Sequence, residues 1–472
     1  MSDTKRVAVI GGGPGGYAAA FMAADLGLEV AIVDPEINPG GVCLYRGCIP
    51  SKALLHIAQV INESREAENW GVQFGKPSID LEKIRLWKDD IVGRLTQGLG
   101  DLSKRRNVTL VQGRAAFASS RSLNVTDPAG ETSILEFDNA ILATGSRPTV
   151  IPSLAVDSPR FMDSTKALEL ESIPKTLLVI GGGYIGMELG SVYAALGSAV
   201  TVVEMTPSLL PGADGNLVGV LAKKIRERMH SVHLNTRVAA LCKVRGGIKA
   251  TLEGKDVGKP QQTFEKVLMA VGRVPNTEEL GMENTGVIAS GNGFIEVDGQ
   301  RRTSDPAIFA IGDITGDPML AHKASHEGVV AAEAIAGKKV AFEPAAIPAV
   351  VFTDPELAWC GLTESQAKAE GRSVKVARFP WAASGRAMTL GRHEGLTKLL
   401  IDPDTDRVLG VGIVGPGAGE LIAEGVLAIE MAALASDLQL TVHPHPTLSE
   451  TVMEAAESYY GVSTHIFNPR KQ

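Results

Sequence analysis

The sequence predicts an α/β protein with two domains built on one strand–helix–strand unit, followed by a C-terminal α+β domain. Three observations support this fold class. The chain has 472 residues, and a prior of about 150 residues per domain suggests roughly three domains. A unit near the N-terminus recurs near residue 180. From about residue 346 the pattern changes to alternating strands and helices without that unit.

The composition is that of a folded protein and does not favour a nucleic-acid or membrane partner. Apolar residues make up 44% and charged residues 21% of the chain, as in globular proteins. A net charge of −8 and 5% aromatic residues are atypical of nucleic-acid binding. Neither a charge-free run of about 20 apolar residues nor a signal-peptide pattern is present. We therefore expect a cytoplasmic protein.

The internal repeat is the strongest feature of the sequence. Residues 7–34 and 177–204 align at an offset of 170 without a gap. Each copy reads as an apolar strand, a glycine-rich turn, a helix of about 12 residues and a second strand that ends in an acid. These acids, Asp34 and Glu204, each lie 23 residues beyond the first glycine of their copy.

Each copy has the spacing of the Rossmann-type dinucleotide-binding fingerprint. In it, the first glycine allows a tight turn, the second lets the backbone approach a diphosphate, and the third lets the helix pack on the strand. The corresponding residues are Gly11, Gly13 and Gly16 in the first copy and Gly181, Gly183 and Gly186 in the second. A single glycine turn also occurs in proteins that bind no nucleotide, but two complete copies disfavour that interpretation. The acid at each end would repel a 2′-phosphate, so NAD is expected rather than NADP.

The repeat also predicts the domain boundaries. We expect a first nucleotide-binding domain at residues 1–148, interrupted near Gly145, and a second at 149–276, closing near Gly272. The segment 277–345 contains another apolar strand that ends at Asp313 and is expected to complete the first domain. Residues 346–472 form the C-terminal domain.

Two of the four cysteines, Cys43 and Cys48, lie five residues apart just after the first repeat. Residues five apart on an ideal helix are separated by about 140° around its axis, so a bond between them needs an irregular segment, which Gly47 favours. A disulfide that closes so small a loop in a reducing compartment is more often catalytic than structural. The alternative is two unrelated buried thiols. Cys242 and Cys360 are isolated, and we expect both to be buried and inert.

Six motifs carry a resemblance to a known family. They are GGVCLYRGCIPSK at residues 40–52, ATGSRP at 143–148, GGGYIGME at 181–188, IGD at 311–313, LAHK at 320–323 and HPHPTLSE at 443–450. Together they resemble the dihydrolipoamide dehydrogenases of the flavoprotein disulfide reductase family, over nearly the whole chain.

The resemblance implies that the first fingerprint binds FAD and the second binds NAD. The residues implied for FAD are Gly11, Gly13, Gly16, Asp34, Gly41, Lys52, Ala115, Gly145, Asp313 and Ala321. Those implied for NAD are Gly181, Gly183, Gly186, Glu204, Val238 and Gly272.

The resemblance also implies catalytic roles around the cysteines. Cys43 exchanges with the substrate, Cys48 lies against the flavin, and Lys52, paired with Glu188, lies near the reactive nitrogen of the flavin. Without the resemblance, Lys52 is a solvated helix lysine and Glu188 an acid favoured by the helix dipole.

His445 and Glu450 are candidates for the base that deprotonates a dithiol. A histidine has a suitable pKa, and a carboxylate can orient its ring. The spacing alone equally fits a capping box in which Glu450 closes the N-terminus of the last helix. The family match favours catalysis for His445. The histidines form no cluster with metal-ligand spacing, so a metal is not expected.

The activity implied is NAD-dependent oxidation of a dihydrolipoyl group carried by another protein. That carrier belongs to a 2-oxoacid dehydrogenase, a glycine cleavage system or another lipoyl-dependent system. The resemblance further implies a homodimer whose C-terminal domain delivers His445 to the cysteines of the partner chain.

One departure from the family pattern and two alternative functions stay open. Tyr45 and Arg46 stand where the family usually has Asn-Val, and Arg46 either favours the thiolates, selects an acidic carrier or is a solvated loop residue. The alternatives are another disulfide reductase of the same family and a catalytically silent docking subunit. Glu204 disfavours glutathione reductase, and the joint presence of the cysteines, Lys52 and His445 disfavours a silent subunit.

Overall fold

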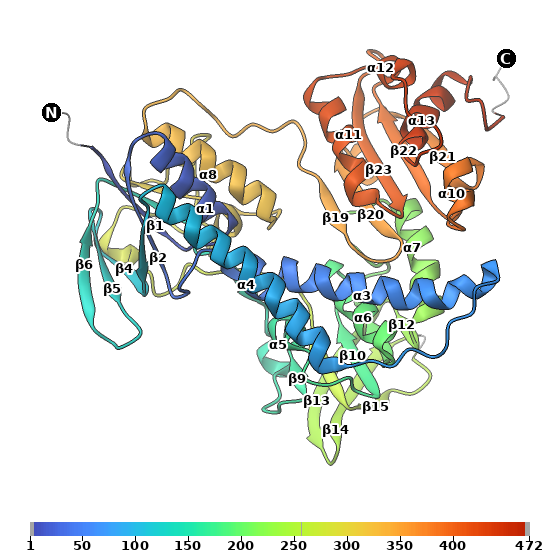
Figure 1. Cartoon of the computed structure of the whole chain (residues 1–472), viewed down its shortest axis with the longest axis horizontal. Helices are drawn as coiled ribbons and strands as arrows, with labels where there is room; N and C mark the ends of the chain where they lie inside the picture. Colours follow the sequence, from blue (N-terminus) through green and yellow to red (C-terminus); the bar gives the residue numbers. More distant parts are fainter. Residues whose placement is uncertain (1–3, 256, 468–472) are drawn as a thin grey trace.

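The computed structural model describes residues 4–255 and 257–467. Residues 1–3 and 468–472, which belong to the predicted first and last domains, lie outside the described residues, as does residue 256. Three groups of elements can be followed in Figure 1: the N-terminal group with α8, the green group below it, and the orange and red C-terminal group.

The first group is built on a parallel sheet that is covered on both faces. In spatial order its strands are β18 (Ile308–Ala310), β7 (Asn139–Leu142), β1 (Arg6–Ile10), β2 (Glu29–Asp34) and β3 (Thr109–Gln112). Val7 and Val9 of β1 pack with residues of α1 (Pro14–Asp25) and α8 (Ala321–Ile335). Ala8 and Ile10 face the antiparallel sheet of β4 (Arg114–Ser119), β5 (Ser122–Thr126) and β6 (Thr132–Glu136). Burial on both faces explains the continuous apolar runs of these strands.

The second group repeats this design. Its parallel strands, in spatial order, are β12 (Ser231–His233), β11 (Ala199–Val203), β10 (Thr176–Ile180), β16 (Lys266–Met269) and β9 (Phe161–Met162). Its helices are α5 (Ser164–Glu169), α6 (Tyr184–Leu196) and α7 (Gly215–Arg228), and an antiparallel sheet is formed by β13 (Thr236–Val244), β14 (Gly247–Gly254) and β15 (Gln261–Phe264). The units β1–α1–β2 and β10–α6–β11 are the two copies of the sequence repeat. Their helices have 12 and 13 residues, as the sequence predicted.

The C-terminal group is an antiparallel sheet with helices. The strands follow the order β19 (Ala349–Val351), β20 (Glu356–Gly361), β23 (Val408–Gly415), β22 (Leu396–Ile401) and β21 (Lys375–Pro380). The helices are α9 (Glu364–Ala369), α10 (Gly385–Thr389), α11 (Ala418–Glu430), α12 (Ala435–Leu440) and α13 (Glu450–Tyr460). The predicted fold class, two dinucleotide-binding units and a C-terminal α+β domain, is confirmed.

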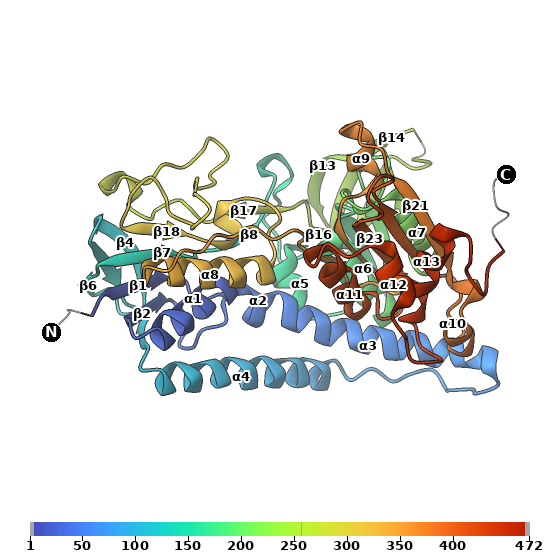
Figure 2. The same cartoon turned by 90° about the horizontal axis from the view of Figure 1, so that it is seen from above.

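Connecting elements join the three groups. Helices α2 (Gly41–Arg46), α3 (Cys48–Glu66) and α4 (Leu81–Arg105) lie along one side of the molecule in Figure 2, where α3 runs beneath the second and third groups and α4 returns beneath the first. Strands β8 (Ser146–Pro148) and β17 (Arg273–Pro275) pair between the first two groups. Short 3₁₀ helices span Ala67–Trp70, Pro152–Leu154, Met282–Asn284, Gly312–Thr315 and Trp381–Ala383. In the described part of the chain, none of the helices combines the length and the apolar character needed to cross a membrane.

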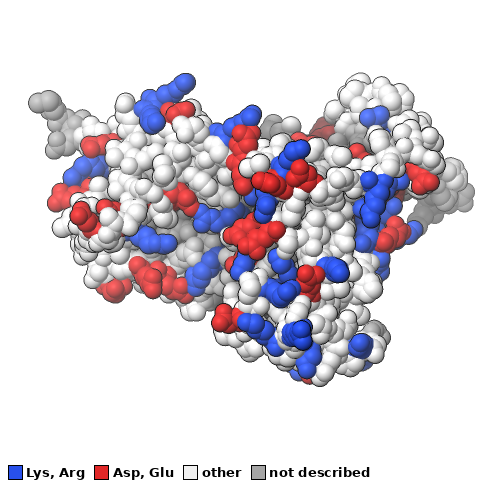
Figure 3. All heavy atoms as spheres, turned by 60° about the horizontal axis from the view of Figure 1, so that its bottom comes forward, with Lys and Arg blue, Asp and Glu red and all other residues white. Residues whose placement is uncertain are grey.

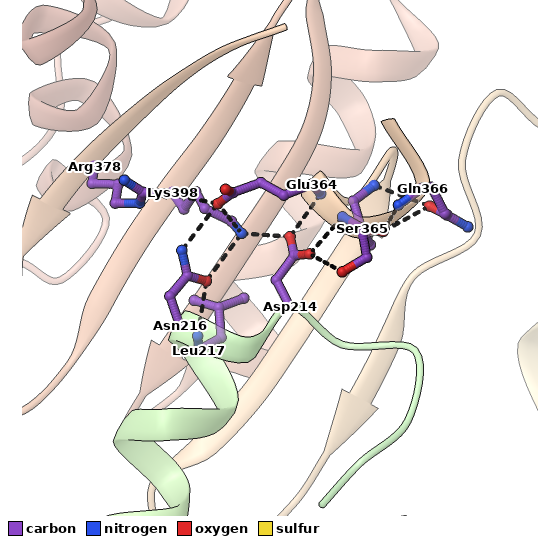
Figure 4. Close-up of polar contacts among 9 residues, drawn as sticks. Asp214, Asn216, Leu217, Glu364, Ser365, Gln366, Arg378 and Lys398 are labelled. Atoms are coloured by element: carbon purple, nitrogen blue, oxygen red, sulfur yellow. Dashed lines mark hydrogen bonds and ion pairs between the residues drawn. The ribbon is translucent and has the colours of Figure 1, made fainter. Parts of the chain in front are cut away.

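A buried ion-pair network fastens the C-terminal group to the second one (Figure 4). The ammonium group of Lys398 on β22 is paired with the carboxylate of Asp214, which precedes α7, and with Oε1 of Glu364 on α9 at 2.9 Å. It also donates to Oδ1 of Asn216 at 3.1 Å. The Lys398 side chain is only 1% exposed. Because a buried charge needs several partners, this network fixes how the two groups are joined.

The two isolated cysteines, Cys360 and Cys242, differ in burial. Cys360 on β20 is buried, as expected, and burial raises its pKa to about 12. Cys242 on β13 is exposed, so the prediction of a buried thiol there is wrong. The physical reason is that β13 is an edge strand of a three-stranded sheet, and buried side chains at its start give way to exposed ones further along. One face of such an antiparallel strand lies toward solvent.

Candidate redox and dinucleotide site

Cys43 and Cys48 lie on either side of a break between two helices. Helix α2 ends at Arg46 and α3 begins at Cys48, and Gly47 between them has φ −142° and ψ −112°. A Cβ atom on Gly47 would lie 2.8 Å from the carbonyl oxygen of Val42. Only glycine therefore fits this break without a shift, and it provides the irregular segment that the cysteine spacing requires.

The two cysteines are unbonded, and their side chains are joined by a hydrogen bond. A hydrogen bond from the Cys43 thiol lowers the pKa of Cys48 to about 7, against the opposing effect of burial, and the Lys52 ammonium lowers it further. The same hydrogen bond, together with burial, raises the pKa of Cys43. Cys48 is consequently the sulfur that becomes a thiolate, and a thiolate is the reactive form of cysteine.

Lys52 is held beside the cysteines by a buried carboxylate. Its Nζ lies 2.8 Å from Oε2 of Glu188, whose side chain is 4% exposed whereas that of Lys52 is 34% exposed. Glu188 comes from α6 of the second group and Lys52 from α3. The positive charge of Lys52 is thus fixed beside the cysteines by a carboxylate 136 positions away in the sequence.

Three further residues complete this arrangement, and sequence reasoning missed them. Ser51 Oγ donates to Glu188 Oε2 at 3.1 Å, and the Phe352 N–H donates to Oε1 at 3.0 Å. The Phe352 ring centre lies 4.4 Å from the Lys52 ammonium. Tyr184 lines the same cavity, and burial raises its pKa to about 12. Ser51 and Tyr184 stand inside the quoted motifs and could have been found there, but no sequence signal marks Phe352.

The first glycine fingerprint opens into the cavity that contains both cysteines. The cavity has a volume of about 750 Å³. Gly11 has φ 103°, and a Cβ atom there would lie 2.3 Å from the Ala143 carbonyl oxygen. A Cβ atom on Gly16 would lie 1.9 Å from the oxygen of Gly11. Glycine is therefore required for both the turn and the close packing of α1 on it.

The carboxylates that end the two repeats accept the same pair of backbone hydrogen bonds. Oδ2 of Asp34 accepts the Gly12 N–H at 2.6 Å, and Oδ1 accepts the N–H two residues further along at 2.8 Å. Oε2 of Glu204 accepts the Gly182 N–H at 2.6 Å, and Oε1 accepts the N–H two residues further along at 2.8 Å. Each carboxylate fixes the adjacent glycine turn and keeps lone pairs for a ribose hydroxyl.

The two turns fit a dinucleotide diphosphate. Helices α1 and α6 begin without a side-chain cap and without an acidic residue in the first turn. Their first N–H groups therefore have no partner within the helix. Beside the second turn, nothing lies within 4 Å of the position of a Gly183 Cβ atom. Free N–H groups with open space in front of them are what a phosphate group needs.

The cavity gathers most of the residues implied for FAD. It is lined by Gly11, Gly13, Asp34, Gly41, Lys52, Ala115, Gly145, Asp313 and Ala321, and also by Cys43, Cys48 and Glu188. Gly16 does not line it and instead packs α1 against the turn. Among the residues implied for NAD, Gly272 has φ 114°, and Val238 is buried among the apolar side chains of the second group. Contact of Val238 with NAD stays a prediction.

His445 and Glu450 form a pair away from the cysteines of their own chain. Nδ1 of His445 lies 2.8 Å from Glu450 Oε1, and Oε2 accepts the Thr447 N–H at 2.8 Å. Burial opposes ionisation of Glu450, but these two contacts hold its pKa below the usual value. The His445 side chain is 72% exposed and does not line the cavity. Glu450 therefore orients the ring and accepts the Thr447 N–H ahead of α13, which is one half of the predicted capping box, although the helix start has no side-chain cap. The neighbouring His443 is 5% exposed and bound to Glu424.

Comparison with known proteins agrees with this geometry. The family described as pyridine nucleotide-disulphide oxidoreductase matches residues 5–328, and its dimerisation domain matches residues 347–456. Dihydrolipoyl dehydrogenase from Vibrio parahaemolyticus is 49% identical over 465 residues, covering 98% of each chain. The enzyme of the same name from Haemophilus influenzae is 49% identical over 465 residues, covering 98% of this chain and 97% of that relative. A crystal structure of LpdA from Mycobacterium tuberculosis aligns with a TM-score of 0.89 at 28% identity, covering 96% of this chain and 99% of that one.

The chain belongs to the pyridine nucleotide-disulphide oxidoreductase family. The resemblance inferred from the six motifs is thereby confirmed. The chain is an oxidoreductase, and its cofactors are FAD and NAD, as the sequence predicted. Its C-terminal group is the dimerisation domain of the family.

Proposed function

We propose that this chain oxidises the dihydrolipoyl group of a carrier protein and reduces NAD⁺ to NADH and H⁺. The observation that carries the proposal is the meeting of Cys43, Cys48 and the Lys52–Glu188 pair in one cavity with the first glycine turn. The identity to dihydrolipoyl dehydrogenases over 98% of the chain supports the choice of substrate.

Exchange begins at Cys43 of the oxidised pair. One thiolate of the dihydrolipoyl group attacks the Cys43 sulfur, forms a mixed disulfide and releases Cys48 as a thiolate. The second substrate thiolate then attacks the substrate sulfur of that mixed disulfide, which yields the lipoyl disulfide and leaves two electrons on the cysteines. The lowered pKa of Cys48 supports attack at Cys43 with release of Cys48. A thiol of lower pKa is the better leaving group.

The substrate protons go to a base and to Cys43. His445 of the partner subunit accepts a proton from the dithiol, and Glu450 holds the imidazole ring and stabilises its charged form. Cys43 takes up the other substrate proton when it leaves the mixed disulfide, as its raised pKa favours. This use of His445 explains why the base is exposed and lies outside the cavity of its own chain.

Lys52 stabilises the reduced cysteine pair as a thiolate at Cys48, the sulfur that would pass electrons to FAD. Bound FAD supplies the two-electron chemistry that links the cysteine pair to NAD⁺. The Lys52 ammonium stabilises negative charge at Cys48. Glu188 prevents Lys52 from turning away, because its carboxylate accepts from Ser51, Lys52 and Phe352 together.

The redox capacity of the purified holoenzyme tests the proposal. Titration with dithionite under argon should consume four electrons per subunit for the native chain, two for FAD and two for the cysteines, and two for Cys48→Ser. The native chain should also form NADH from dihydrolipoamide and NAD⁺. A native chain that takes up only two electrons, or one that reduces glutathione disulfide faster than it oxidises dihydrolipoamide, would remove the proposal.

The carrier belongs to a lipoyl-dependent system, with a 2-oxoacid dehydrogenase or a glycine cleavage system as the candidates. On the face shown in Figure 3, acidic and basic side chains are interspersed. Recognition of a carrier on that face therefore depends on local pairs, because no broad region of one sign is present there. A cytoplasmic location stays a prediction. Assaying candidate lipoyl proteins side by side distinguishes the carriers.

A further inference from the structure

Arg46 stands between the two redox cysteines, yet its side chain extends toward the other end of the cavity. It is the last residue of α2 and lines the cavity together with Asp34 and Glu36. Its guanidinium forms an ion pair with Glu36 Oε1, and the two side chains are 41% and 31% exposed. Arg46 is thus fixed near the acid of the first fingerprint and does not extend freely into solvent.

The neighbouring Tyr45 contacts the same loop. Its hydroxyl donates to the carbonyl oxygen of Asn38 at 3.0 Å. Tyr45 and Arg46 are the two residues that depart from the family pattern, and both bind the loop 35–40 that joins β2 to α2. Pro35 and Glu36 of this loop line the cavity. The two departures therefore hold the loop at the edge of the cavity.

Near Asp34 and Glu36, a bound dinucleotide would add negative charge to negative charge, so a cation is needed there. Asp34 and Glu36 already contribute two carboxylates, and a dinucleotide adds two phosphate charges. Arg46 and Arg114 both line the cavity, and the charges of both act on Asp34. Burial raises the pKa of Asp34, whereas the Gly12 N–H and then Arg46 and Arg114 oppose that effect, so both guanidinium groups act on the ribose-binding acid. Arginine is also suited to phosphate, because its planar group donates two parallel hydrogen bonds.

We propose that Arg46, oriented by Glu36, binds the adenosine diphosphate half of FAD and lowers its dissociation constant. This inference rests on the proposed function only in taking the cavity to hold FAD. It assigns Arg46 to cofactor binding in place of the docking and solvated-loop alternatives that its sequence position left open.

The test is the dissociation constant of FAD, measured by titrating FAD into the apoenzyme and following flavin fluorescence. Arg46→Val should raise the dissociation constant at least about tenfold, and Arg46→Lys should raise it by less, because lysine keeps the charge but loses the paired hydrogen bonds. Glu36→Gln should also weaken binding, since the guanidinium loses its orienting partner. The matched control is Arg237→Val, which removes an exposed Arg–Glu pair on β13 and should leave the constant unchanged.

A dissociation constant for Arg46→Val within twofold of the native value overturns the proposal. So does a variant that binds FAD normally but loses rate with a lipoyl protein more than with free dihydrolipoamide, which would assign Arg46 to carrier docking. Thermal unfolding of the apoenzymes shows whether Arg46→Val folds, and Arg46→Lys keeps the test decisive if it does not. Failure of the proposed function can be told apart from failure of the Arg46 proposal. A native chain that binds FAD but does not oxidise dihydrolipoamide would contradict the proposed function, and the dissociation constants of FAD for the native chain and the variants could still be compared.

Discussion

At the residue scale, the chemistry depends on which sulfur of the reduced pair carries the proton. The hydrogen bond from Cys43 and the charge of Lys52 both favour a thiolate at Cys48. Lys52 is itself positioned by Glu188, which is buried and has all its contacts satisfied within the protein. The thiolate therefore depends on residues from α2, α3 and α6 at once.

Replacing Lys52 tests this dependence. A nearby cation lowers the pKa of a thiol, so Lys52→Met should raise the pKa of Cys48. In the two-electron-reduced holoenzyme, the thiolate-to-flavin charge-transfer absorbance should then appear at higher pH than in the native chain. Lys83→Met, an exposed change on α4, is the control. An unchanged or lower pH midpoint for Lys52→Met contradicts the electrostatic role.

We expect the coenzyme preference to depend on a second single residue, Glu204. Glu204 has its carboxylate fixed by two backbone N–H groups beside the glycine turn, and Met205 next to it is 75% exposed. Changing Glu204→Ser and Met205→Arg together removes the charge that repels a 2′-phosphate and adds a cation that binds it. The ratio of kcat/KM for NADP⁺ to that for NAD⁺ should rise at least about tenfold. A constant ratio would place coenzyme selection elsewhere, and an unchanged KM for dihydrolipoamide controls for wider damage.

At the scale of elements, the break between α2 and α3 determines how close the cysteines lie. A continuous helix would point Cys43 and Cys48 about 140° apart around its axis. Gly47 interrupts the helix, and its backbone lies directly against Val42 and Cys43. The break is thus a structural requirement of the redox pair.

Substitution of Gly47 tests that requirement. A Cβ atom at this position meets the Val42 oxygen at 2.8 Å and the Cys43 Cα at 3.2 Å. Gly47→Ala should destabilise the protein by about 1–3 kcal/mol, as overpacking does, and should slow closure of the disulfide. Gly98→Ala on α4, where nothing lies within 4 Å, should instead stabilise by about 0.5–1 kcal/mol. Urea unfolding measures the change in stability, and thiol titration measures the rate of disulfide closure. Equal stability and equal closure rates for Gly47→Ala and Gly98→Ala would contradict the steric argument.

Whether the sequence could predict a feature at this scale depends on how far apart in the chain its residues lie. The two fingerprints were predictable, because a glycine turn, its helix and its acid lie within 28 consecutive residues. The irregular segment between the cysteines was predictable from their spacing. Contacts that join distant elements were not, and Phe352 reaches Glu188 from a strand edge 164 residues away. The pairing of Arg46 with Glu36, residues only 10 apart, was missed because it depends on how the loop between β2 and α2 folds. The exposure of Cys242 depends on the edge position of β13.

At the scale of the whole molecule, the Lys398 network joins the dimerisation domain to the second nucleotide-binding group (Figure 4). Removing one partner of a buried ion pair leaves the other charge uncompensated. Lys398→Met should therefore cost about 3–5 kcal/mol of stability. Adding Asp214→Asn should recover part of the loss, because the buried negative charge is then removed as well. Thermal unfolding measures both, and a neutral Lys398→Met would show that the network contributes nothing.

The same network predicts a pH dependence. Burial opposes ionisation of Asp214 and Glu364. Lys398, together with backbone N–H groups at Asp214 and with Arg378 at Glu364, outweighs burial and holds both pKa values below their usual range. A carboxyl whose pKa is depressed in the folded state contributes stability that is present above its unfolded value, near pH 4, and is lost as the pH falls through the folded value. Below about pH 4 the unfolding temperature of the native chain should therefore fall more steeply than that of Lys398→Met. Parallel curves for the two proteins would contradict this assignment.

The sharing of the active site between subunits is the last property of the whole molecule to test. His445 is 72% exposed and absent from the cavity that holds Cys43 and Cys48, and Figure 2 shows α13 well away from α2. In a two-fold dimer, His445 of the partner subunit would complete each of two identical sites. Subunits carrying Cys48→Ser and subunits carrying His445→Ala should each be inactive alone.

Mixing the two variants separates the alternatives. In a shared arrangement, every mixed dimer has one site with both mutations and one site with neither. Random mixing gives half mixed dimers, each with one of two sites intact, so about a quarter of the native activity should return. If each chain supplied its own base, both sites of a mixed dimer would carry one mutation and no activity would return. Absence of recovery in a sample shown by native mass spectrometry to contain mixed dimers would therefore exclude the shared site.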